Sequence, residues 1–273
     1  TPKPSSAASD VYKRQLRDHT GAVAVVGATA PVPGWEDRTV WLDPWPRVGA
    51  GGWAYTADPD PATHPGADWS WREYLVTRAD LEATVRALGT GVLAGWSLAG
   101  TTAAEALRIE AGRPRRALDV DDRAIPHELD LLRTAVHLEK GCYRGQETVA
   151  RVHNLGRPPR RLTRLLLDGS VHALPEHGAP VILRPAEDTP EARAAARPVG
   201  TVTAAAQHHE AGAVALALLK RTVPVDAELL VREDAPGEDG AAEGGWIAAS
   251  QEPLVSPDAG QVVGRPRGVG RLR

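Results

Sequence analysis

The sequence predicts an α+β fold, in which a core of helices and strands is followed by a small antiparallel β-barrel. Two observations carry this prediction. Apolar residues at helical spacing recur between residues 79 and 155, whereas after residue 162 short β-type runs are separated by Gly, Pro and Asp. Between the two regions lies Arg157-Pro158-Pro159, which a helix cannot cross. We therefore expect residues 16–158 to form the core, residues 159–257 the barrel and residues 258–273 a disordered tail.

Residues 1–15 are expected to be a non-native leader. Residues 5–15 resemble the in-frame translation of a transposase adapter used in sequencing libraries, and the chain contains no methionine. We therefore expect the native amino-terminal part of the core to be missing, so that the core is incomplete. The alternative interpretation is a short disordered tail of Ser, Ala and Lys.

In the first part of the chain, two strands are expected to precede four helices. The expected elements are strands 21–26 and 73–77 and helices 79–88, 101–111, 127–136 and 146–155. Helix 79–88 follows from Leu81, Val85 and Leu88, and helix 101–111 is expected to place Ala104, Leu107 and Ala111 on one face.

Two further helices are expected on either side of the single cysteine. Pro126 suits the first turn of helix 127–136. The helix 146–155 should turn Val149 and Val152 inward and end at Gly156.

The second part reads as six short strands. They cover residues 162–167, 179–183, 198–204, 213–219, 228–231 and 246–249. The segments 184–197 and 234–245 are rich in Ala, Glu, Pro and Gly and are expected to be mobile hairpin loops. His208-His209 has only Glu210 beside it, which is no metal-ligand set, and is expected in a surface hairpin.

Composition restricts the class of protein. Hydrophobic residues make up 42% of the chain and charged residues 25%, which suits a soluble globular protein. A formal net charge of −3 gives no general attraction to nucleic acid or anionic membranes. One cysteine cannot form an internal disulfide, and neither a signal peptide nor an apolar run of 18 residues is visible. We therefore expect a cytoplasmic protein.

The most informative segment holds that only cysteine. It reads Lys140-Gly141-Cys142-Tyr143-Arg144-Gly145-Gln146-Glu147, called here the signature loop. Because the thiol precedes a helix and lies beside two cations, its pKa is expected to fall below the roughly 8.5 of a free thiol. The glycines permit positive φ or close approach to a ligand, and Gln146 and Glu147 suit the donor and acceptor edge of a pterin.

Two alternatives for Cys142 stay open. It could be a buried structural cysteine, since free cysteine is among the most buried residue types. It could also pair with His127, His137 or His153 for acyl transfer, but no spacing selects one of them, and helical histidines near a basic stretch are more often solvated or capping residues.

A second pattern precedes the signature loop. It consists of Leu107-Arg108-Ile109-Glu110-Ala111-Gly112, then Asp119-Val120-Asp121, then Pro126-His127-Glu128. Together with the signature loop, it resembles the YgfZ branch of the YgfZ/GcvT family, relatives of the glycine-cleavage T-protein. Order and spacing fit over residues 79–161.

The resemblance implies both a fold and a function. It implies a T-protein-like core that binds tetrahydrofolate or a derivative, followed by the barrel, and a role in assembly or repair of iron-sulfur cluster proteins, the clients being the implied partners. Cys142 would be the reactive residue. The implied folate-binding residues are Lys140, Tyr143, Gln146, Glu147, Arg108 and Glu128, with no metal site. Arg108 and Glu128 could equally be structural salt-bridge partners.

Other functions stay open under the same resemblance. A folate-dependent aminomethyltransferase is one, although the chain has Ala104-Glu105 where the T-protein has an Arg-Asp pair. A tRNA-modification factor is another. Whether the protein is an enzyme is undecided, and an accessory factor is favoured.

The stretch from residue 140 to 164 is rich in cations. Its seven basic residues are Lys140, Arg144, Arg151, Arg157, Arg160, Arg161 and Arg164, against the single acid Glu147. Such a run could hold a folate polyglutamate tail or a tRNA backbone. Because Tyr143 is its only aromatic residue, we expect a solvated basic face or an anionic cofactor rather than nucleic acid.

Overall fold

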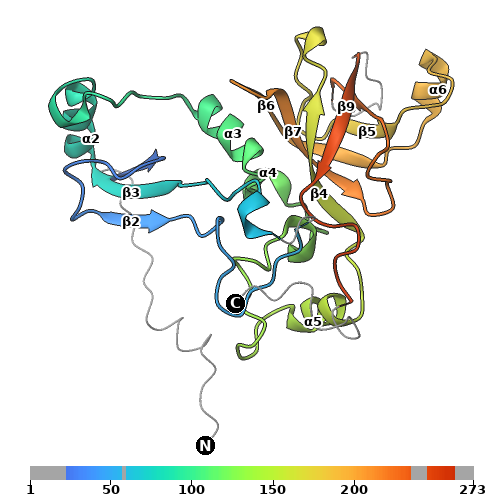
Figure 1. Cartoon of the computed structure of the whole chain (residues 1–273), viewed down its shortest axis with the longest axis horizontal. Coiled ribbons are helices and arrows are strands. Elements are labelled where there is room, and N and C mark those ends of the chain that lie inside the picture. Colours follow the sequence, from blue (N-terminus) through green and yellow to red (C-terminus); the bar gives the residue numbers. More distant parts are fainter. Residues whose placement is uncertain (1–22, 57–59, 235–244, 262–273) are drawn as a thin grey trace, which may run out of the picture.

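The computed structural model describes residues 23–56, 60–234 and 245–261. A three-stranded sheet lies at one end of the molecule, a closed six-stranded barrel lies at the other, and helix α3 (Thr101–Glu110) lies between them (Figure 1). The predicted α+β class and the antiparallel barrel are confirmed. The expected leader, residues 1–15, lies outside the described residues.

The small sheet has the order β1-β3-β2 and is antiparallel throughout. Its strands are β1 (Val23–Ala28), β2 (Thr39–Leu42) and β3 (Arg72–Thr77). Helix α2 (Arg78–Ala87) follows β3 directly, because the Thr77 hydroxyl accepts a hydrogen bond from the Asp80 N–H at 3.1 Å and caps the first turn. Together with the short helix η2 (Gly91–Leu93), α2 covers one face of the sheet.

The opposite face of this sheet is open in the part of the chain that the structure describes. The register pairs Val25 with Leu75, and both side chains remain exposed, at 65% and 44%. Trp41 of β2 lies on the same face and is 45% exposed. Because strand residues alternate between two faces, Tyr74 and Val76 of β3 lie on the covered face and are buried, whereas Leu75 lies on the open face.

Helix α3 packs on the outside of the barrel through a face that differs from the predicted one, of which only Ala111, directly after the helix, is buried. Ala106 and Ile109 are buried and join a core with Leu216 and Leu218 of the barrel, whereas Ala104 and Leu107 are only partly buried. The predicted face is rotated because the barrel, not the small sheet, is the main surface that the helix contacts.

The barrel closes in the order β4-β7-β6-β5-β8-β9. Its strands are β4 (Arg160–Leu167), β5 (Pro180–Leu183), β6 (Gly200–His208), β7 (Gly212–Lys220), β8 (Leu229–Arg232) and β9 (Trp246–Pro253). All six predicted strands are present. Strand β7 is buried on both faces, since Ala215 and Ala217 point into the barrel while Leu216 and Leu218 pack under α3. That double burial explains its continuous apolar sequence.

The predicted helix 127–136 is wrong. Only a short 3-10 helix, η3 (Pro126–Leu129), forms there, and it ends at Asp130, whose φ of 53° is left-handed. The Asp130 carboxylate accepts hydrogen bonds from the Tyr55 N–H at 2.6 Å and from Arg133 Nε at 2.7 Å. These tertiary bonds stop the helix, because an aspartate adopts the left-handed region more readily than most residues and its side chain competes with backbone bonding.

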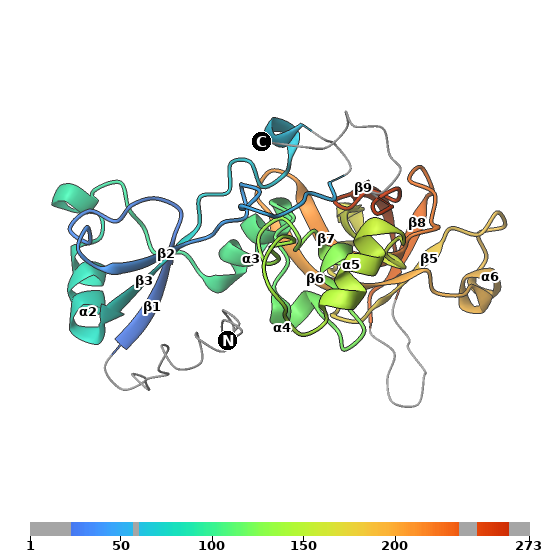
Figure 2. The same cartoon turned by 90° about the horizontal axis from the view of Figure 1, so that it is seen from below.

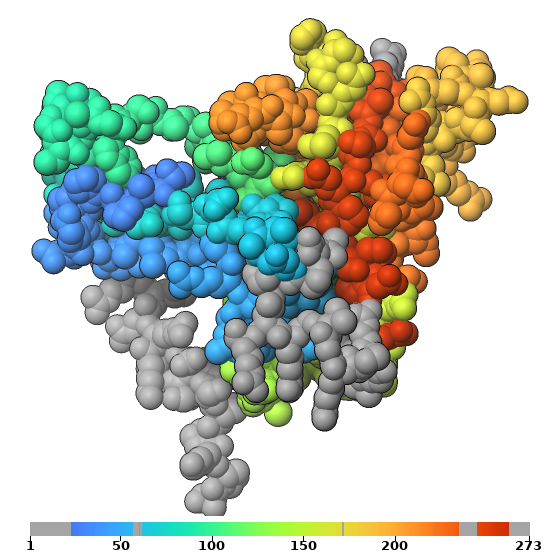
Figure 3. Space-filling model, in the orientation of Figure 1, coloured from blue at the N-terminus to red at the C-terminus, as the bar shows by residue number. Residues whose placement is uncertain are grey.

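Helix α5 (Gln146–Asn154) follows the signature loop and lies in front of the barrel in the view from below (Figure 2). Val149 faces inward as predicted and packs with Leu162 of β4 and Leu129 of η3. Figure 3 shows the small sheet and α2 on one side of the molecule and the barrel on the other.

The remaining helices are short. They are η1 (Pro61–Thr63), α4 (Arg116–Asp119), η4 (Gly169–Val171) and α6 (Pro190–Ala195). Helix α6 lies inside the segment expected to be a mobile loop, where the Thr189 hydroxyl caps its first turn. Most of segment 234–245 and residues 262–273 lie outside the described residues. Of the expected tail, Ala259 is buried and the Gln261 N–H donates to the Gly156 carbonyl at 2.9 Å.

Candidate functional site

The signature loop is an exposed turn at the start of α5. Gly145 caps the helix with a φ of 87°, a left-handed conformation that glycine adopts without strain. Cys142 is exposed, which excludes the buried structural cysteine. The Lys140 ammonium lies 5.3 Å from the centre of the Tyr143 ring, and Glu147, 91% exposed, lies 3.5 Å from Arg151. The loop thus presents its thiol, cation and carboxylate to solvent.

The three histidines considered as partners of Cys142 are all engaged elsewhere. His127 Nε2 lies 3.1 Å from the Val149 carbonyl, and His153 Nδ1 lies 2.9 Å from the Tyr55 hydroxyl. His137 Nδ1 accepts the Glu139 N–H at 3.2 Å. The structure therefore forms no Cys-His pair among the described residues.

Two of those histidines lie in a buried ring cluster formed by Trp53, Tyr55, His127 and His153. Tyr55 stacks on His127 and His153 with ring centres 5.5 Å and 6.0 Å apart, and Trp53 meets His153 edge-on. Burial lowers the pKa of His127 to about 4 and also lowers that of His153. Both rings are buried, so the expectation of solvated histidines is wrong at these two positions, and the cluster packs beneath α5 instead.

Glu128 is fully buried and is tied to the barrel. Its carboxylate accepts from Arg160 Nε at 3.0 Å and Nη2 at 2.9 Å, and it also accepts the Ile125 N–H. Arg160 also forms a salt bridge with Asp121 at 2.6 Å, and its hydrogen bonds lower the pKa of Asp121 to about 2. Glu128 thus clamps η3 to β4.

Arg108 is also buried and is bound to carboxylates. Its guanidinium contacts Asp119 at 2.8 Å and Glu105 at 2.9 Å, and Asp119 in turn accepts from the Thr203 hydroxyl of the barrel. Arg108 and Glu128 are each a structural ion-pair partner, although not of one another.

The basic run 140–164 does not form a single face. Arg161 is fully buried, where its guanidinium donates to the carbonyls of Arg221 and Val223 and to Gln251. Burial lowers its pKa. Arg157, Arg160 and Arg164 pair with acids of other segments. Only Lys140, Arg144 and Arg151 remain at the signature loop and α5.

A cavity that sequence reasoning missed lies between the small sheet and α3. Its volume is about 280 Å³. The lining side chains are Trp41, Asp43, Trp69, Trp71, Glu73, Ala104, Arg108, Arg113, Pro114, Arg115, Arg116, Val120 and Leu131. We call it the tryptophan cavity. It is close to the lower end of the about 300–1,000 Å³ range of small-molecule sites.

The tryptophans of this cavity form an aromatic wall. Trp69 and Trp71 stack with ring centres 5.7 Å apart and planes 13° apart. Gly27 makes room for Trp71, because a Cβ at Gly27 would lie 2.1 Å from the Trp71 ring. Gly27 is in register with Glu73 and lies against the Trp71 ring, an arrangement that is visible only once the register is known.

The charges of the tryptophan cavity are partly neutralised. Arg113 binds the Asp43 carboxylate at 2.9 Å, and the Trp69 indole donates to the same group at 3.0 Å. Glu73 forms no ion pair with any described residue and accepts only a 3.3 Å bond from the Trp71 indole. The cavity therefore offers flat apolar faces and a hydrogen-bond-accepting carboxylate.

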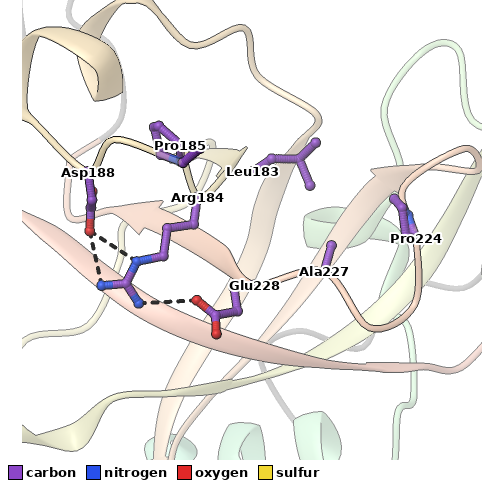
Figure 4. A pocket seen from close by; sticks show the side chains of 8 residues that line it. Leu183, Arg184, Pro185, Asp188, Pro224, Ala227 and Glu228 are labelled. Atoms are coloured by element: carbon purple, nitrogen blue, oxygen red, sulfur yellow. Dashed lines mark hydrogen bonds and ion pairs between the residues drawn. The ribbon is translucent and has the colours of Figure 1, made fainter.

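A second hollow of about 530 Å³ lies on the barrel. In Figure 4, Arg184 bridges Asp188 and Glu228 at one side. The other lining residues are Leu183, Pro185, Ala186, Pro224 and Ala227. Its only guanidinium is already paired twice. It is the weaker candidate for a binding site.

His208 corrects the surface-hairpin expectation. It is 2% exposed, and its Nε2 lies 3.1 Å from Glu110 of α3, whereas His209 is exposed as expected. Within the described ranges, no group of three or more metal-ligating side chains occurs. Likewise, none of the helices in those ranges has the length and apolar character needed to cross a membrane.

These features define a protein with an α+β core, a closed barrel and a cavity between the small sheet and α3. No family model matches the sequence. The chain is 35% identical over 131 residues to the tRNA-modifying protein YgfZ of Shigella dysenteriae and 34% identical to that of Escherichia coli. Each match covers 48% of this chain and 37% of the relative, so the chain spans little more than a third of the length of these relatives. The similarity supports the YgfZ resemblance over about half of the chain.

Proposed function

We propose that this protein binds tetrahydrofolate or a derivative in the tryptophan cavity. The single observation that carries the proposal is the combination of the stacked Trp69 and Trp71 with the unpaired carboxylate of Glu73. A pterin is flat and presents amino and ring N–H donors along one edge, so it stacks on tryptophan faces and donates to a carboxylate.

The cavity fits the head of a folate better than the whole molecule. A volume of about 280 Å³ suits a bicyclic ring system with part of its linker, and the remainder would extend towards solvent. Arg108 lines this cavity, but it is bound to two carboxylates and therefore is not a free donor for the ligand. When bound, the cofactor supplies a carrier for one-carbon units.

The signature loop would then serve a second partner. Cys142 is exposed and flanked by cations, which suits a thiol that meets another macromolecule. We propose that it acts in assembly or repair of iron-sulfur cluster proteins. A single thiol would not by itself hold a cluster, for which four thiolates are usual.

The names of the relatives favour a second candidate, a factor in tRNA modification. A role in tRNA modification predicts that the protein binds tRNA and that its affinity for tRNA falls steeply with salt concentration, because binding releases counterions. Filter binding of tRNA between 50 and 200 mM salt distinguishes the two: a steep slope supports the RNA role, and no binding leaves the protein-client role. Aminomethyl transfer has no comparable support, because Ala104-Glu105 replaces the Arg-Asp pair.

Calorimetric titration with 5-formyltetrahydrofolate tests the folate proposal. We expect saturable binding by the wild type and by Cys142→Ala, and at least tenfold weaker binding by Trp71→Ala. Trp246→Ala is the matched control, since Trp246 lies on β9 and outside the cavity lining. No binding by the folded wild type would overturn the proposal.

A further inference from the structure

The hydroxyl of Tyr55 lies against a buried imidazole. Tyr55 is 3% exposed, and its phenolic oxygen lies 2.9 Å from His153 Nδ1. A neutral imidazole carries one N–H and one lone pair, so the tautomer with its proton on Nε2 accepts the phenolic hydrogen bond at Nδ1. Burial lowers the pKa of His153, which favours the neutral imidazole. The structure therefore holds a phenol directly against a base that can take its proton.

Aromatic rings surround this phenol–imidazole pair. The Tyr55 ring stacks on His153 and His127, and the Trp53 indole meets His153 edge-on with ring centres 5.1 Å apart. Trp53 is only partly buried, so its indole connects the buried pair with the surface. An indole and a phenol are both side chains that lose one electron readily. Trp53 is thus placed to carry an electron from Tyr55 to an oxidant outside the protein.

We propose that Tyr55 is a redox-active tyrosine, which gives an electron through Trp53 to a one-electron oxidant at the surface and its phenolic proton to His153. In the first step, the oxidant takes one electron from the Trp53 indole and leaves a radical cation. In the second step, Tyr55 reduces this radical cation while its hydroxyl proton moves to His153 Nδ1. Tyr55 becomes a neutral phenoxyl radical and His153 an imidazolium, so no proton has to reach water. This activity is independent of the proposed folate site.

The two other tyrosines in the described part of the chain have different surroundings. Tyr74 is also buried, but its hydroxyl accepts a hydrogen bond from the Val32 N–H at 3.2 Å, and no described imidazole is hydrogen-bonded to it. The Lys140 ammonium lies 5.3 Å from the centre of the Tyr143 ring, and its positive charge opposes the removal of an electron from that ring. Oxidation of a phenol is unfavourable unless its proton leaves as well. Tyr55 is therefore the expected radical site, and Tyr74 is its matched control.

The test is oxidation of the full chain by photo-oxidised ruthenium tris(bipyridine), followed by transient absorption and electron paramagnetic resonance. We expect a phenoxyl radical that forms at a rate independent of buffer concentration, because its proton acceptor lies inside the protein. Tyr55→Phe should lose this signal and Tyr74→Phe should keep it. His153→Gln, which removes the base, should slow phenoxyl formation about a hundredfold. His127→Gln should keep the wild-type rate, because His127 stacks on the ring but is hydrogen-bonded to the Val149 carbonyl.

The contrary outcomes are equally clear, once circular dichroism has shown that each variant is folded. A buffer-independent phenoxyl signal in Tyr55→Phe would assign the radical to another tyrosine and overturn the inference. An unchanged rate in His153→Gln would show that this imidazole does not take the proton and would overturn it as well. Trp53→Phe should slow phenoxyl formation, and a wild-type rate in this variant would overturn the route through the indole. A folded wild type that forms only tryptophan radicals would also contradict the inference.

Discussion

The barrel and the segment from residue 126 to residue 145 are stabilised in opposite ways. In the barrel, apolar side chains fill the interior, and β7 is buried on both faces. In segment 126–145, the buried side chains include His127, Glu128, Asp130 and Arg133, and no regular element exceeds four residues. Apolar burial tolerates small rearrangement, whereas buried charge depends on a particular partner.

That difference bears on the site. Both flanks of the signature loop are held by polar contacts: Asp130 to Tyr55 on one side, and His127 to the Val149 carbonyl of α5 on the other. The barrel supplies a rigid support through Arg160 and Glu128. The exposed loop is thus displayed on a base whose geometry is set by hydrogen bonds.

The largest effect should come from Asp130→Ala. This change leaves the buried Arg133 without its carboxylate and puts alanine at a φ of 53°, so we expect a loss of about 3–5 kcal/mol in the free energy of unfolding. Urea denaturation monitored by tryptophan fluorescence measures it. Asp130→Asn, which keeps an acceptor for the Tyr55 N–H, should lose less; equal losses would contradict the importance of that bond.

Leu165→Ala is the apolar counterpart in the barrel. Leu165 is fully buried among alanines and valines, and its truncation should cost about 2–5 kcal/mol, independent of pH. A loss that changed with pH, as we expect for variants of segment 126–145, would contradict the difference between the two regions.

The next effect is the pH dependence of stability. His64 and His127 have pKa values lowered to about 4, so between about pH 4 and 6.5 each binds more protons in the unfolded chain, and stability rises with pH. Asp130 contributes in the opposite direction. Burial raises its pKa to about 6, so between about pH 4 and 6 this carboxyl binds more protons in the folded chain, and its contribution to stability falls as pH rises. Denaturation at pH 4.5, 5.5 and 6.5 should show a net rise.

Variants identify the groups behind that rise. His127→Gln should flatten the slope by about 1.4 kcal/mol per pH unit, the value for one proton. Asp130→Asn should steepen it. A profile that His127→Gln leaves unchanged would show that this ring does not stay neutral on folding.

A smaller effect is expected from Gly27→Ala. The new methyl group would collide with Trp71, so the indole must move, at a cost of about 1–3 kcal/mol, and folate binding should weaken. Gly141→Ala is the matched control for stability, since nothing lies within 4 Å of a Cβ there. Unaltered binding by Gly27→Ala would argue against the tryptophan wall as the pterin site.

The smallest effect on stability should follow Cys142→Ala. The thiol is exposed, so the free energy of unfolding should change by no more than about 0.5 kcal/mol, while restoration of iron-sulfur enzyme activity in a deficient strain should be lost. Arg86→Ala serves as the surface control in the same strain. Full activity of the Cys142→Ala protein would remove the thiol from the function.

The sequence by itself determined the helices and strands in which the spacing of apolar residues shows whether one face or both faces are buried. Strands β4 to β9 and helices α2, α3 and α5 all lie within a few residues of their predicted positions, because apolar spacing and Gly or Pro stops are local signals. The signature loop was found from a different local signal, the single cysteine of the chain between two glycines.

Only the tertiary structure decided the rest. The helix expected at 127–136 is absent because Asp130 bonds to Tyr55, which lies 75 residues away in the chain. The tryptophan cavity is lined by residues of two strands, of α3 and of the segment after it. No spacing in the sequence predicts that these residues lie together. The acids that pair with Arg113, Arg160 and Arg164 are likewise decided by long-range contacts, since a charge shows its sign in the sequence but not its partner.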